Sequence, residues 1–414
     1  MGNRIIMHID VNSAYLSWEA VWRLQHGGEI DLREIPSVIG GHEESRHGIV
    51  LAKSIPAKKI GIQTGEVLWQ ARSKCPDLTV IHPNYELYMQ CSEALMELLR
   101  RYSPLLERYS VDECFLDVTG SLGKRPPVDL ALEISRRVRE ELGFTVNIGI
   151  SYNKLLAKMA SELEKPNKVH TIFPREIPEK LWPLPVKELF MVGRRTGPKL
   201  HRLNIFTIGQ LAKADPRFLT EHFKSFGKML WRYANGIDDS PVNPWGTVPK
   251  GIGNSLTTPY DVDNKREAFL FLLSLTETAA SRLRRAGLMA RVVSVSIRRK
   301  DLSFSSHQRR LFSPTNITEV LFKNIKTLFL EFWGKEPLRH FGVAFSELCN
   351  DQFYQVSVFD EERLSRKKAL DLSIDGIRGR YGNTSLVRGS FINSGIPPLS
   401  GGIMEDYPAM RSQL

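Results

Sequence analysis

The stretch YSVDECFLDVTG, residues 109–120, places two adjacent carboxylates, Asp112 and Glu113, inside an apolar run that is typical of a β-strand. Side chains along a strand alternate between its two faces, so neighbouring residues should not share one environment. A turn carrying solvated acids is the alternative, but apolar residues continue on both sides of the pair. We therefore expect a local bend or a strand end at these acids, where both carboxylates can reach the same ligand.

A third acid, Asp10, ends another apolar run, RIIMHI, which we interpret as the first strand. Three buried carboxylates near one sheet would repel each other unless a cation lay between them. Hard oxygen ligands are what Mg²⁺ prefers, and substrate phosphates commonly complete its shell. Two such ions would activate a 3′-hydroxyl and stabilise a leaving pyrophosphate. The acids therefore predict a phosphoryl-transfer site that uses two Mg²⁺ ions.

The charge balance points to a polyanionic partner. The chain has 57 Lys and Arg residues against 46 Asp and Glu residues, a formal net charge of +11. Nucleic acid is favoured over a membrane, because no apolar run approaches the roughly 20 residues that cross a bilayer. We expect no signal peptide. The four cysteines have no C-x-x-C spacing, which argues against a zinc site or a disulfide framework and favours a reducing cytoplasm.

The length of 414 residues predicts two to four domains. Residues 1–170 alternate predicted strands and helices in antiparallel-looking pairs, which favours a split β-α-β layer with an insertion between Leu24 and Cys75. A helical region follows. It contains FMVGRRTGPKLHRLNI, residues 190–205, which resembles a helix-hairpin-helix in which Met191 replaces the first expected glycine. A plain helical connector is the alternative.

A segment rich in Pro, Gly and Asp then predicts a linker, and beyond it a compact α+β unit is expected. The predicted strands and turn of that unit carry a dense group of basic side chains. Such a group is often only a solvated face, but its density favours a surface that follows nucleic-acid phosphates. The group includes Arg298, Arg299 and Lys300.

Three motifs together carry a family resemblance: HIDVNSAYLSWE (residues 8–19), YSVDECFLDVTG and NIGISYNKLLAKMASELEKPNK (residues 147–168). In this order and spacing they resemble the Y-family translesion DNA polymerases. The DVN start and the AKSIPAKKIG segment (residues 52–61) are more similar to the bacterial polymerase V branch than to the DinB-like branch.

The resemblance covers roughly residues 1–355 and implies an α+β right-hand polymerase that acts on damaged DNA. It implies a monomer in the bacterial cytoplasm, associated with the nucleoid and expressed in the SOS response to DNA damage. The implied parts are a ferredoxin-like palm (1–24 and 75–170), small fingers (25–74), a helical thumb with the helix-hairpin-helix (171–236), a linker (237–250), an α+β little finger (251–350) and a tail (351–414).

Roles for individual residues follow from the same resemblance. Asp10, Asp112 and Glu113 match the metal-binding acids of the family, with the Val11 carbonyl as a further ligand. Ser13 and Ala14 lie where backbone amides meet the triphosphate, and Lys165 matches a triphosphate lysine, although its turn alone would suggest a solvated residue. Tyr15 matches the steric gate against ribonucleotides. Its alternative is a core aromatic residue.

The fingers depart from the family pattern. Many relatives have a Tyr and an Arg, three residues apart, that contact the phosphates of the incoming nucleotide. The corresponding residues here are Ile55 and Lys58. Lys58 supplies a charge but no bidentate fork, and Ile55 cannot form a hydrogen bond through its side chain. Lys53 or Lys59 is a candidate to compensate.

The implied partners are primer-template DNA, a deoxynucleoside triphosphate and a sliding clamp. DNA would bind at the hairpin residues Gly193, Arg194 and Arg195 and at the basic group described above. QVSVF resembles the bacterial clamp-binding motif, with Gln355, Val358 and Phe359 as its anchors; an ordinary edge strand is the alternative. Two other functions are alternatives: a nucleotidyl cyclase on a related palm, and a catalytically silent clamp-associated DNA-binding factor.

Overall fold

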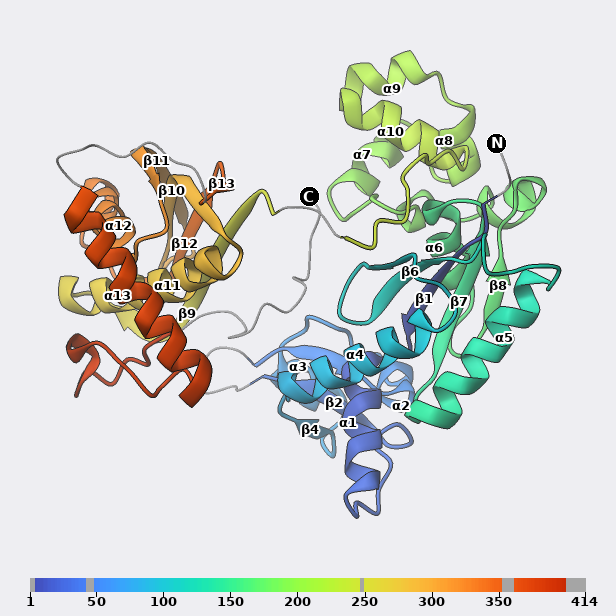
Figure 1. The fold of residues 1–414 in the computed structure, drawn as a ribbon. Helices are drawn as coiled ribbons and strands as arrows, with labels where there is room; N and C mark the ends of the chain where they lie inside the picture. The colour runs from blue at the N-terminus through green and yellow to red at the C-terminus, as the bar shows by residue number, and fades with distance from the viewer. Residues whose placement is uncertain (1–3, 42–47, 246–248, 352–360, 400–414) are drawn as a thin grey trace. The chain divides into compact units, whose positions relative to one another are not determined.

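The computed structural model describes residues 4–41, 48–245, 249–351 and 361–399 (Figure 1). Within them the chain forms two compact units, the first from residues 4–41 and 49–245 and the second from residues 249–351 and 361–399. Each unit has its own sheet and hydrophobic core. Among the described helices, none is both long and apolar enough to cross a membrane.

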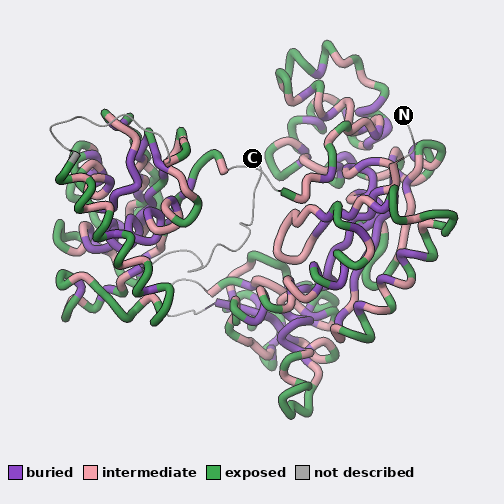
Figure 2. The backbone as a smooth tube through the Cα atoms, viewed as in Figure 1, coloured by how far each residue is buried: buried purple, intermediate pink, exposed green. Residues whose placement is uncertain are grey.

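The main sheet of the first unit has five strands in the order β5-β6-β1-β7-β8. The central strand is β1 (Ile6–Val11), and all of its residues are buried (Figure 2). It pairs antiparallel with β6 (Glu113–Asp117) on one side and with β7 (Val146–Ser151) on the other. The edge strands are β5 (Leu106–Arg108), antiparallel to β6, and β8 (Val169–Thr171), parallel to β7.

The two faces of this sheet differ in character because side chains alternate along β1. Met7 and Ile9 belong to the large apolar core on one face. On the other face Ile6 packs with Ala157, and His8 and Asp10 follow it at the period of two. The polar residues of β1 therefore share the second face. The helices packed with the sheet are α4 (Tyr85–Arg100), α5 (Pro127–Arg137) and α6 (Lys154–Glu162).

A smaller sheet in the same unit has three strands in the order β3-β2-β4, with β2 antiparallel to β3 and parallel to β4. It has its own small core, in which Val38, Val50 and Leu68 are fully or almost fully buried. The elements of this region are α1 (Ala14–Gln25), β2 (Ser37–Gly40), β3 (Val50–Lys53), α2 (Ile55–Lys59), α3 (Leu68–Lys74) and β4 (Thr79–Ile81).

A helical region completes the first unit, as the sequence predicts. Met191 has a positive φ of 76°, a backbone conformation that favours glycine. Its position therefore keeps the backbone shape of the hairpin glycine that Met191 replaces. The helices are α7 (Thr196–Arg202), α8 (Ile208–Lys213), α9 (Pro216–Phe223) and α10 (Ser225–Ala234), around one apolar core.

The second unit is built on a four-stranded antiparallel sheet in the order β11-β10-β12-β9, with a short strand, β13, beside β10. Two helices pack against this sheet around a shared apolar core. The elements are β9 (Gly251–Val262), α11 (Lys265–Arg285), β10 (Leu288–Arg299), β11 (Phe304–Thr315), α12 (Thr318–Phe332), β12 (Leu338–Ser346) and β13 (Cys349–Asn350).

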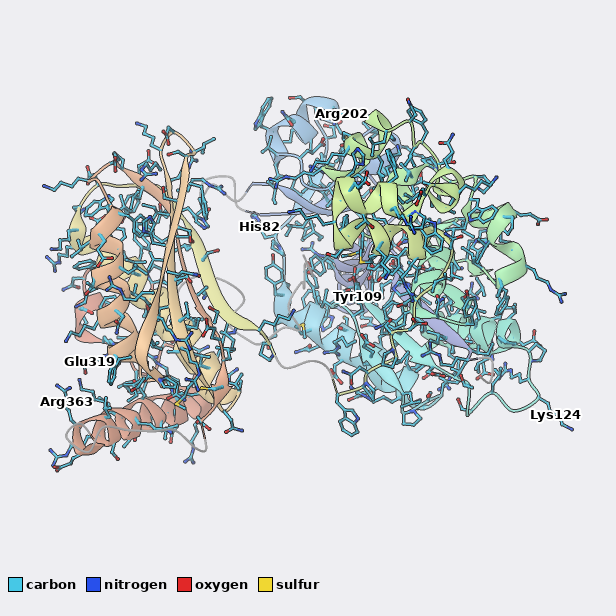
Figure 3. All side chains as sticks on the ribbon, turned by 90° about the horizontal axis from the view of Figure 1, so that it is seen from above. His82, Tyr109, Lys124, Arg202, Glu319 and Arg363 are labelled. Atoms are coloured by element: carbon cyan, nitrogen blue, oxygen red, sulfur yellow. The ribbon has the colours of Figure 1, made fainter. Side chains whose placement is uncertain are left out.

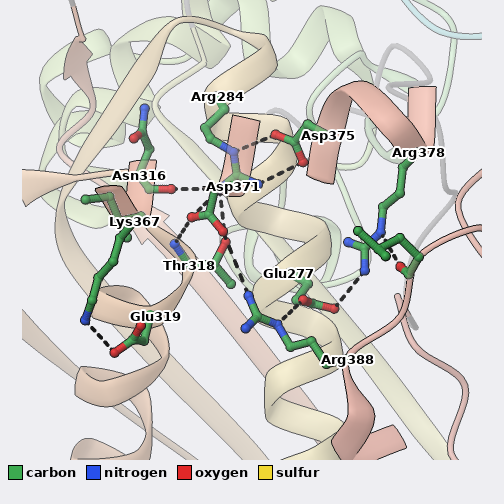
Figure 4. A network of polar contacts seen from close by, with 12 residues as sticks. Glu277, Arg284, Asn316, Thr318, Glu319, Lys367, Asp371, Asp375, Arg378 and Arg388 are labelled. Carbon is green, nitrogen blue, oxygen red and sulfur yellow. Dashed lines mark hydrogen bonds and ion pairs between the residues drawn. The ribbon is translucent and has the colours of Figure 1, made fainter. Parts of the chain in front are cut away.

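Residues 361–399, predicted to belong to a separate tail, pack with this second unit. Helix α13 (Glu361–Tyr381) lies along α11, and Phe391 and Ile396 enter the core of the unit. Buried ion pairs join the two helices (Figure 4): Arg284 binds Asp375 through Nε at 2.6 Å and through Nη2 at 2.9 Å. The described C-terminal segment is thus an integral part of the second unit.

Candidate active site

Strand pairing brings two of the predicted acids together. Asp10 on β1 lies directly opposite Glu113 on β6, so both carboxylates project from the face of the sheet that α6 covers. Asp10 is only 6% exposed, and burial raises its pKa to about 7, against the opposing effect of Lys165. The side-by-side acids confirm that this end of β1 and β6 is a charged site and not part of the core.

Helix α6 adds a third carboxylate. One oxygen from each of Asp10, Glu113 and Glu162 lies within 4.8 Å of the other two. Among the described residues this is the group whose donor atoms are close enough to hold a metal ion. The sequence analysis did not select Glu162. Its position at the end of a helix, three residues before Lys165, was the available signal.

A lysine neutralises each end of this cluster. Lys165 Nζ lies 2.8 Å from Asp10 Oδ2 and 2.9 Å from Glu162 Oε1. Lys158 Nζ lies 2.8 Å from Glu113 Oε2 and also 5.1 Å from the centroid of the Tyr109 ring, which is labelled in Figure 3. Although burial favours a neutral amine, Asp10 and Glu162 raise the pKa of Lys165 above its ordinary value. Both lysines are charged partners of the acids.

His8 stands behind Glu113 on the same face of β1. Its Nδ1 lies 2.7 Å from Ser161 Oγ, and its Nε2 lies 3.6 Å from Glu113 Oε2. Complete burial lowers the pKa of His8 to about 4, so the ring is neutral at pH 7. Burial also raises the pKa of Glu113, but the His8 and Lys158 contacts outweigh burial and lower it to about 2. Because His8 is neutral, Lys158 is the charge that keeps Glu113 ionised.

Asp112 lies just before the first residue of β6, in a bend, as the opening stretch predicts. Its backbone carbonyl accepts a hydrogen bond from the Val11 N–H at 3.1 Å, and its Oδ1 accepts one from Ser110 Oγ at 2.7 Å. Burial raises the pKa of Asp112. In this arrangement its carboxylate turns to Ser110 and stands outside the cluster that Glu162 completes.

The predicted nucleotide-binding residues follow β1 and flank the cluster. Ser13 has a left-handed backbone conformation (φ 48°) and precedes the first turn of α1 at Ala14. Tyr15 is half-buried, and its ring stacks on Tyr88 with centroids 4.6 Å apart. The packing of Tyr15 among aromatic rings agrees with the core alternative and leaves its steric role a prediction.

The two altered fingers residues lie on α2, outside the acidic cluster. Ile55 is its first residue and is 45% exposed, and Lys58 is exposed near its end. Burial and the charge of Lys58 lower the pKa of Lys53, whose Nζ lies 3.2 Å from Thr64 Oγ1. Two positive charges therefore lie close together here, and Lys53 is a candidate to reinforce the charge of Lys58.

The predicted DNA-binding residues lie in two places. Gly193, Arg194 and Arg195 form an exposed turn directly before α7, closed by hydrogen bonds from the Thr196 and Gly197 amides to the Gly193 carbonyl. In the second unit, Arg298 and Lys300 are exposed near the end of β10, and Arg299 is held at 2.8 Å by Ser305 Oγ. Residues Gln355, Val358 and Phe359 lie outside the described residues.

Comparison with known proteins identifies the fold. A Y-family DNA polymerase chimera of Dbh and Dpo4 superposes with a TM-score of 0.72 at 22% identity, over 84% of this chain and 99% of that one. The fold is therefore that of the Y-family polymerases, with an α+β palm and fingers, a helix-hairpin-helix thumb and a β-sheet little finger.

Sequence comparison identifies the family. The model of the impB/mucB/samB family matches residues 9–162, that of its C-terminal domain residues 249–358, and that of its HHH motif residues 174–205. The chain belongs to this family of Y-family DNA polymerases, and it is a translesion DNA-directed DNA polymerase.

The relatives also bear on the branch of the family. This chain is 48% identical to DNA polymerase IV of Clostridium acetobutylicum, over 93% of this chain and 98% of that protein. It is 38% identical to DNA polymerase IV of Acetivibrio thermocellus, over 93% and 97% respectively. These relatives do not support the predicted similarity to the polymerase V branch. The DVN start and the fingers segment that suggested it are short, and similarity over nearly the whole chain outweighs them.

Proposed function

We propose that this chain is a polymerase of the DNA polymerase IV branch that adds deoxynucleotides opposite damaged template bases by a two-Mg²⁺ mechanism. The observation that carries the proposal is the pair of opposed, largely buried carboxylates of Asp10 and Glu113, each bound by a lysine ammonium at 2.8 Å. The branch rests on the similarity to proteins named DNA polymerase IV along nearly the whole chain.

Asp10 and Glu113 fit Mg²⁺, because they offer carboxylate oxygens within 4.8 Å of each other, which are hard ligands at the spacing of one cation. We propose Asp10, Asp112, Glu113 and the Val11 carbonyl as the ligands. When bound, the ions supply Lewis acidity to the primer 3′-hydroxyl and charge stabilisation to the leaving pyrophosphate. The chain would supply Asp112 by a side-chain rotation away from Ser110, which now holds it at 2.7 Å.

The remaining residues bind and orient the nucleotide. When the nucleotide binds, Lys165 would exchange its contacts with Asp10 and Glu162 for contacts with the triphosphate, because its positive charge offsets the negative charge of the phosphates. The amides of Ser13 and Ala14 lie at the N-terminus of α1. Backbone N–H groups there lack intrahelical partners and can donate hydrogen bonds to phosphate oxygens. Tyr15 would exclude a 2′-hydroxyl, and Lys58 would contact the triphosphate from the fingers.

The domain boundaries are part of the same proposal. The palm would comprise residues 1–24 and 75–170, the fingers 25–74, the thumb 171–236, the linker 237–250 and the little finger 251–350. The five-stranded sheet and the helical region support the palm and thumb segments. The other two boundaries lack this support, because β4 (Thr79–Ile81) pairs with β2 in the three-stranded sheet and residues 361–399 pack with the second unit. The exposed turn at Gly193 and the basic end of β10 would contact the DNA backbone.

Primer extension with Mg²⁺ and deoxynucleoside triphosphates tests the site. Asp10→Asn, Asp112→Asn and Glu113→Gln should each lower the extension rate by at least about 10³-fold. Asp129→Asn is the matched control, because Asp129 is an exposed acid on α5 outside the cluster. Full activity of Asp112→Asn would remove Asp112 from the metal site and leave Glu162 as the third ligand.

A sliding clamp is the further partner in this proposal. Its motif at Gln355–Phe359 follows β13 in the sequence and lies outside the described residues. Tethering a distributive enzyme to its template raises its effective concentration there. Alanine at Gln355 and Phe359 should abolish the stimulation of extension by a bacterial clamp and leave extension without the clamp unchanged. Clamp stimulation that survives both substitutions would exclude this segment as the anchor.

A further inference from the structure

The second unit has an apolar groove between the start of α11 and the middle of α12. Phe269, Leu270 and Leu273 of α11 and Phe322 of α12 form its apolar lining, called its floor below, and Ser390 of the C-terminal segment also lines it. The groove encloses about 500 Å³, which is within the range of roughly 300–1,000 Å³ that is typical of ligand pockets. It is built from residues outside the acidic cluster.

Three basic residues, Lys265, Arg266 and Lys326, line the groove together with these apolar residues, and no acid lines it among the residues that the structure describes. Two of the ammonium groups lie over the aromatic floor: Lys265 Nζ is 5.4 Å from the Phe269 ring centroid, and Lys326 Nζ is 4.8 Å from that of Phe322. These rings stabilise the positive charges at the groove without neutralising them.

Among the described residues these three cations are unpaired, whereas several other cations on this unit are paired with acids. Lys367 pairs with Glu319, Arg309 with Glu331 and Arg310 with Glu347. Over the described part of the chain, by contrast, no salt bridge joins Lys265, Arg266 or Lys326 to an acid. Three unpaired charges around an apolar floor form a surface that complements a negative partner with an apolar anchor.

We propose that this groove is a docking site for an acidic peptide segment of a partner protein, whose aromatic or large aliphatic side chain enters the groove while its carboxylates meet Lys265, Arg266 and Lys326. A DNA backbone offers the negative charge but no apolar side chain for the floor. The apolar floor therefore favours a peptide over nucleic acid. The proposal is independent of the catalytic assignment.

Fluorescence polarisation with the full-length protein tests the proposal. The probe is a fluorescein-labelled synthetic peptide in which a run of aspartates precedes two phenylalanines, and its matched control has alanines in place of both phenylalanines. The first peptide should bind with a Kd on the order of 10 µM, and the control at least about tenfold more weakly. Raising the salt concentration should weaken binding, because the charges at the groove are exposed to screening.

Two protein variants separate charge from shape. The double substitution Lys265→Glu with Lys326→Glu should weaken peptide binding by at least about tenfold. Ser390→Trp should weaken it by filling the groove while all three charges remain. Lys323→Glu, an exposed charge reversal on the same helix outside the groove, is the matched control and should leave the Kd unchanged. All three variants should retain primer extension.

Three outcomes would overturn the proposal. The first is no binding of the phenylalanine peptide up to about 200 µM. The second is equal binding of both peptides, which would make the surface merely electrostatic. The third is a loss of DNA affinity in the double variant that matches its loss of peptide affinity, which would assign the cations to the DNA backbone.

Discussion

The Nζ atom of Lys165 lies 2.8 Å from Asp10 Oδ2, although Lys165 follows Asp10 by 155 residues in the sequence. This contact joins the turn after α6 to the end of β1. It places a lysine charge beside an acid that we propose as a metal ligand. In the proposed mechanism the lysine has two partners in turn, the Asp10 carboxylate and the triphosphate.

Replacement of Lys165 should show whether this lysine binds the triphosphate or only pairs with Asp10. Lys165→Met removes the charge that meets the triphosphate, so kcat/KM for the incoming nucleotide should fall about 10²-fold, equivalent to about 2.7 kcal/mol. Lys165→Arg keeps a charge and should recover part of the loss. Steady-state primer extension at varied nucleotide concentration provides the measurement, and an unchanged kcat/KM in Lys165→Met would show that the lysine serves Asp10 alone.

The buried ring of His8 should make stability depend on pH. Its folded pKa of about 4 lies below the ordinary value, so the unfolded chain binds a proton that the folded chain does not between about pH 4 and 6.5. Acidification through this range should therefore destabilise the fold, by up to about 3 kcal/mol.

The raised pKa of Asp10 acts in the opposite sense, since the folded state then binds the extra proton between about pH 4 and 7. The His8 contribution is consequently measured as a difference between two proteins. Urea unfolding with EDTA at several pH values should show that the wild type loses more stability than His8→Gln as the pH falls. Parallel pH profiles for the two proteins would contradict this account.

The ion pairs beneath α13 give a prediction about stability alone. The Arg284 side chain is 5% exposed and also donates to the Asn316 carbonyl at 2.9 Å. Arg284→Met leaves Asp375 without its arginine and Asp371 with only the longer pair to Arg388 at 3.8 Å, which should destabilise the second unit by about 3–5 kcal/mol. Arg366→Met on α13 is the control. Its partner Glu362 is 82% exposed, so the change should stay within about 0.5 kcal/mol. Thermal unfolding monitored by circular dichroism distinguishes the two variants.

A substitution at Tyr15 tests whether its ring selects against ribonucleotides or only packs in the core. If its ring excludes the 2′-hydroxyl, Tyr15→Ala should raise the ratio of ribonucleotide to deoxynucleotide incorporation by about 10–100-fold. Tyr88→Phe keeps the stacked ring and should leave the ratio unchanged. A Tyr15→Ala enzyme with the original ratio and a lower melting temperature would make Tyr15 a core residue only.

The position of the acids at a strand end was predictable from sequence. Apolar residues continue on both sides of Asp112 and Glu113, which favours a bend or end of a strand there. Asp10 and Glu113 face each other because β1 and β6 pair in a register that places them opposite one another. The hairpin glycine replaced by Met191 was also recognisable, and its positive φ confirms the shape of the backbone there.

The additional residues of the site could not be found in this way. Lys158 and Glu162 reach the acids only because α6 packs across the same face of the sheet as His8 and Asp10, and this depends on tertiary contacts. The tail was predicted, but the attachment of its helix α13 to α11 depends on arginine–carboxylate pairs 87 to 101 residues apart. Pairing at such separation leaves no periodic signal in the sequence.

The parallel pairing of β2 with β4 has an evolutionary consequence. The segment between β2 and β4 is an excursion whose two ends meet at neighbouring strands, and β3 within it also pairs with β2. Lengthening a loop whose ends already meet costs little free energy. Mutation can therefore insert, delete or reshape residues in this excursion, and with them the surface near Ile55 and Lys58, without changing the register of β1 and β6. Substrate preference can diverge between lineages while the acids that we propose as catalytic stay in place.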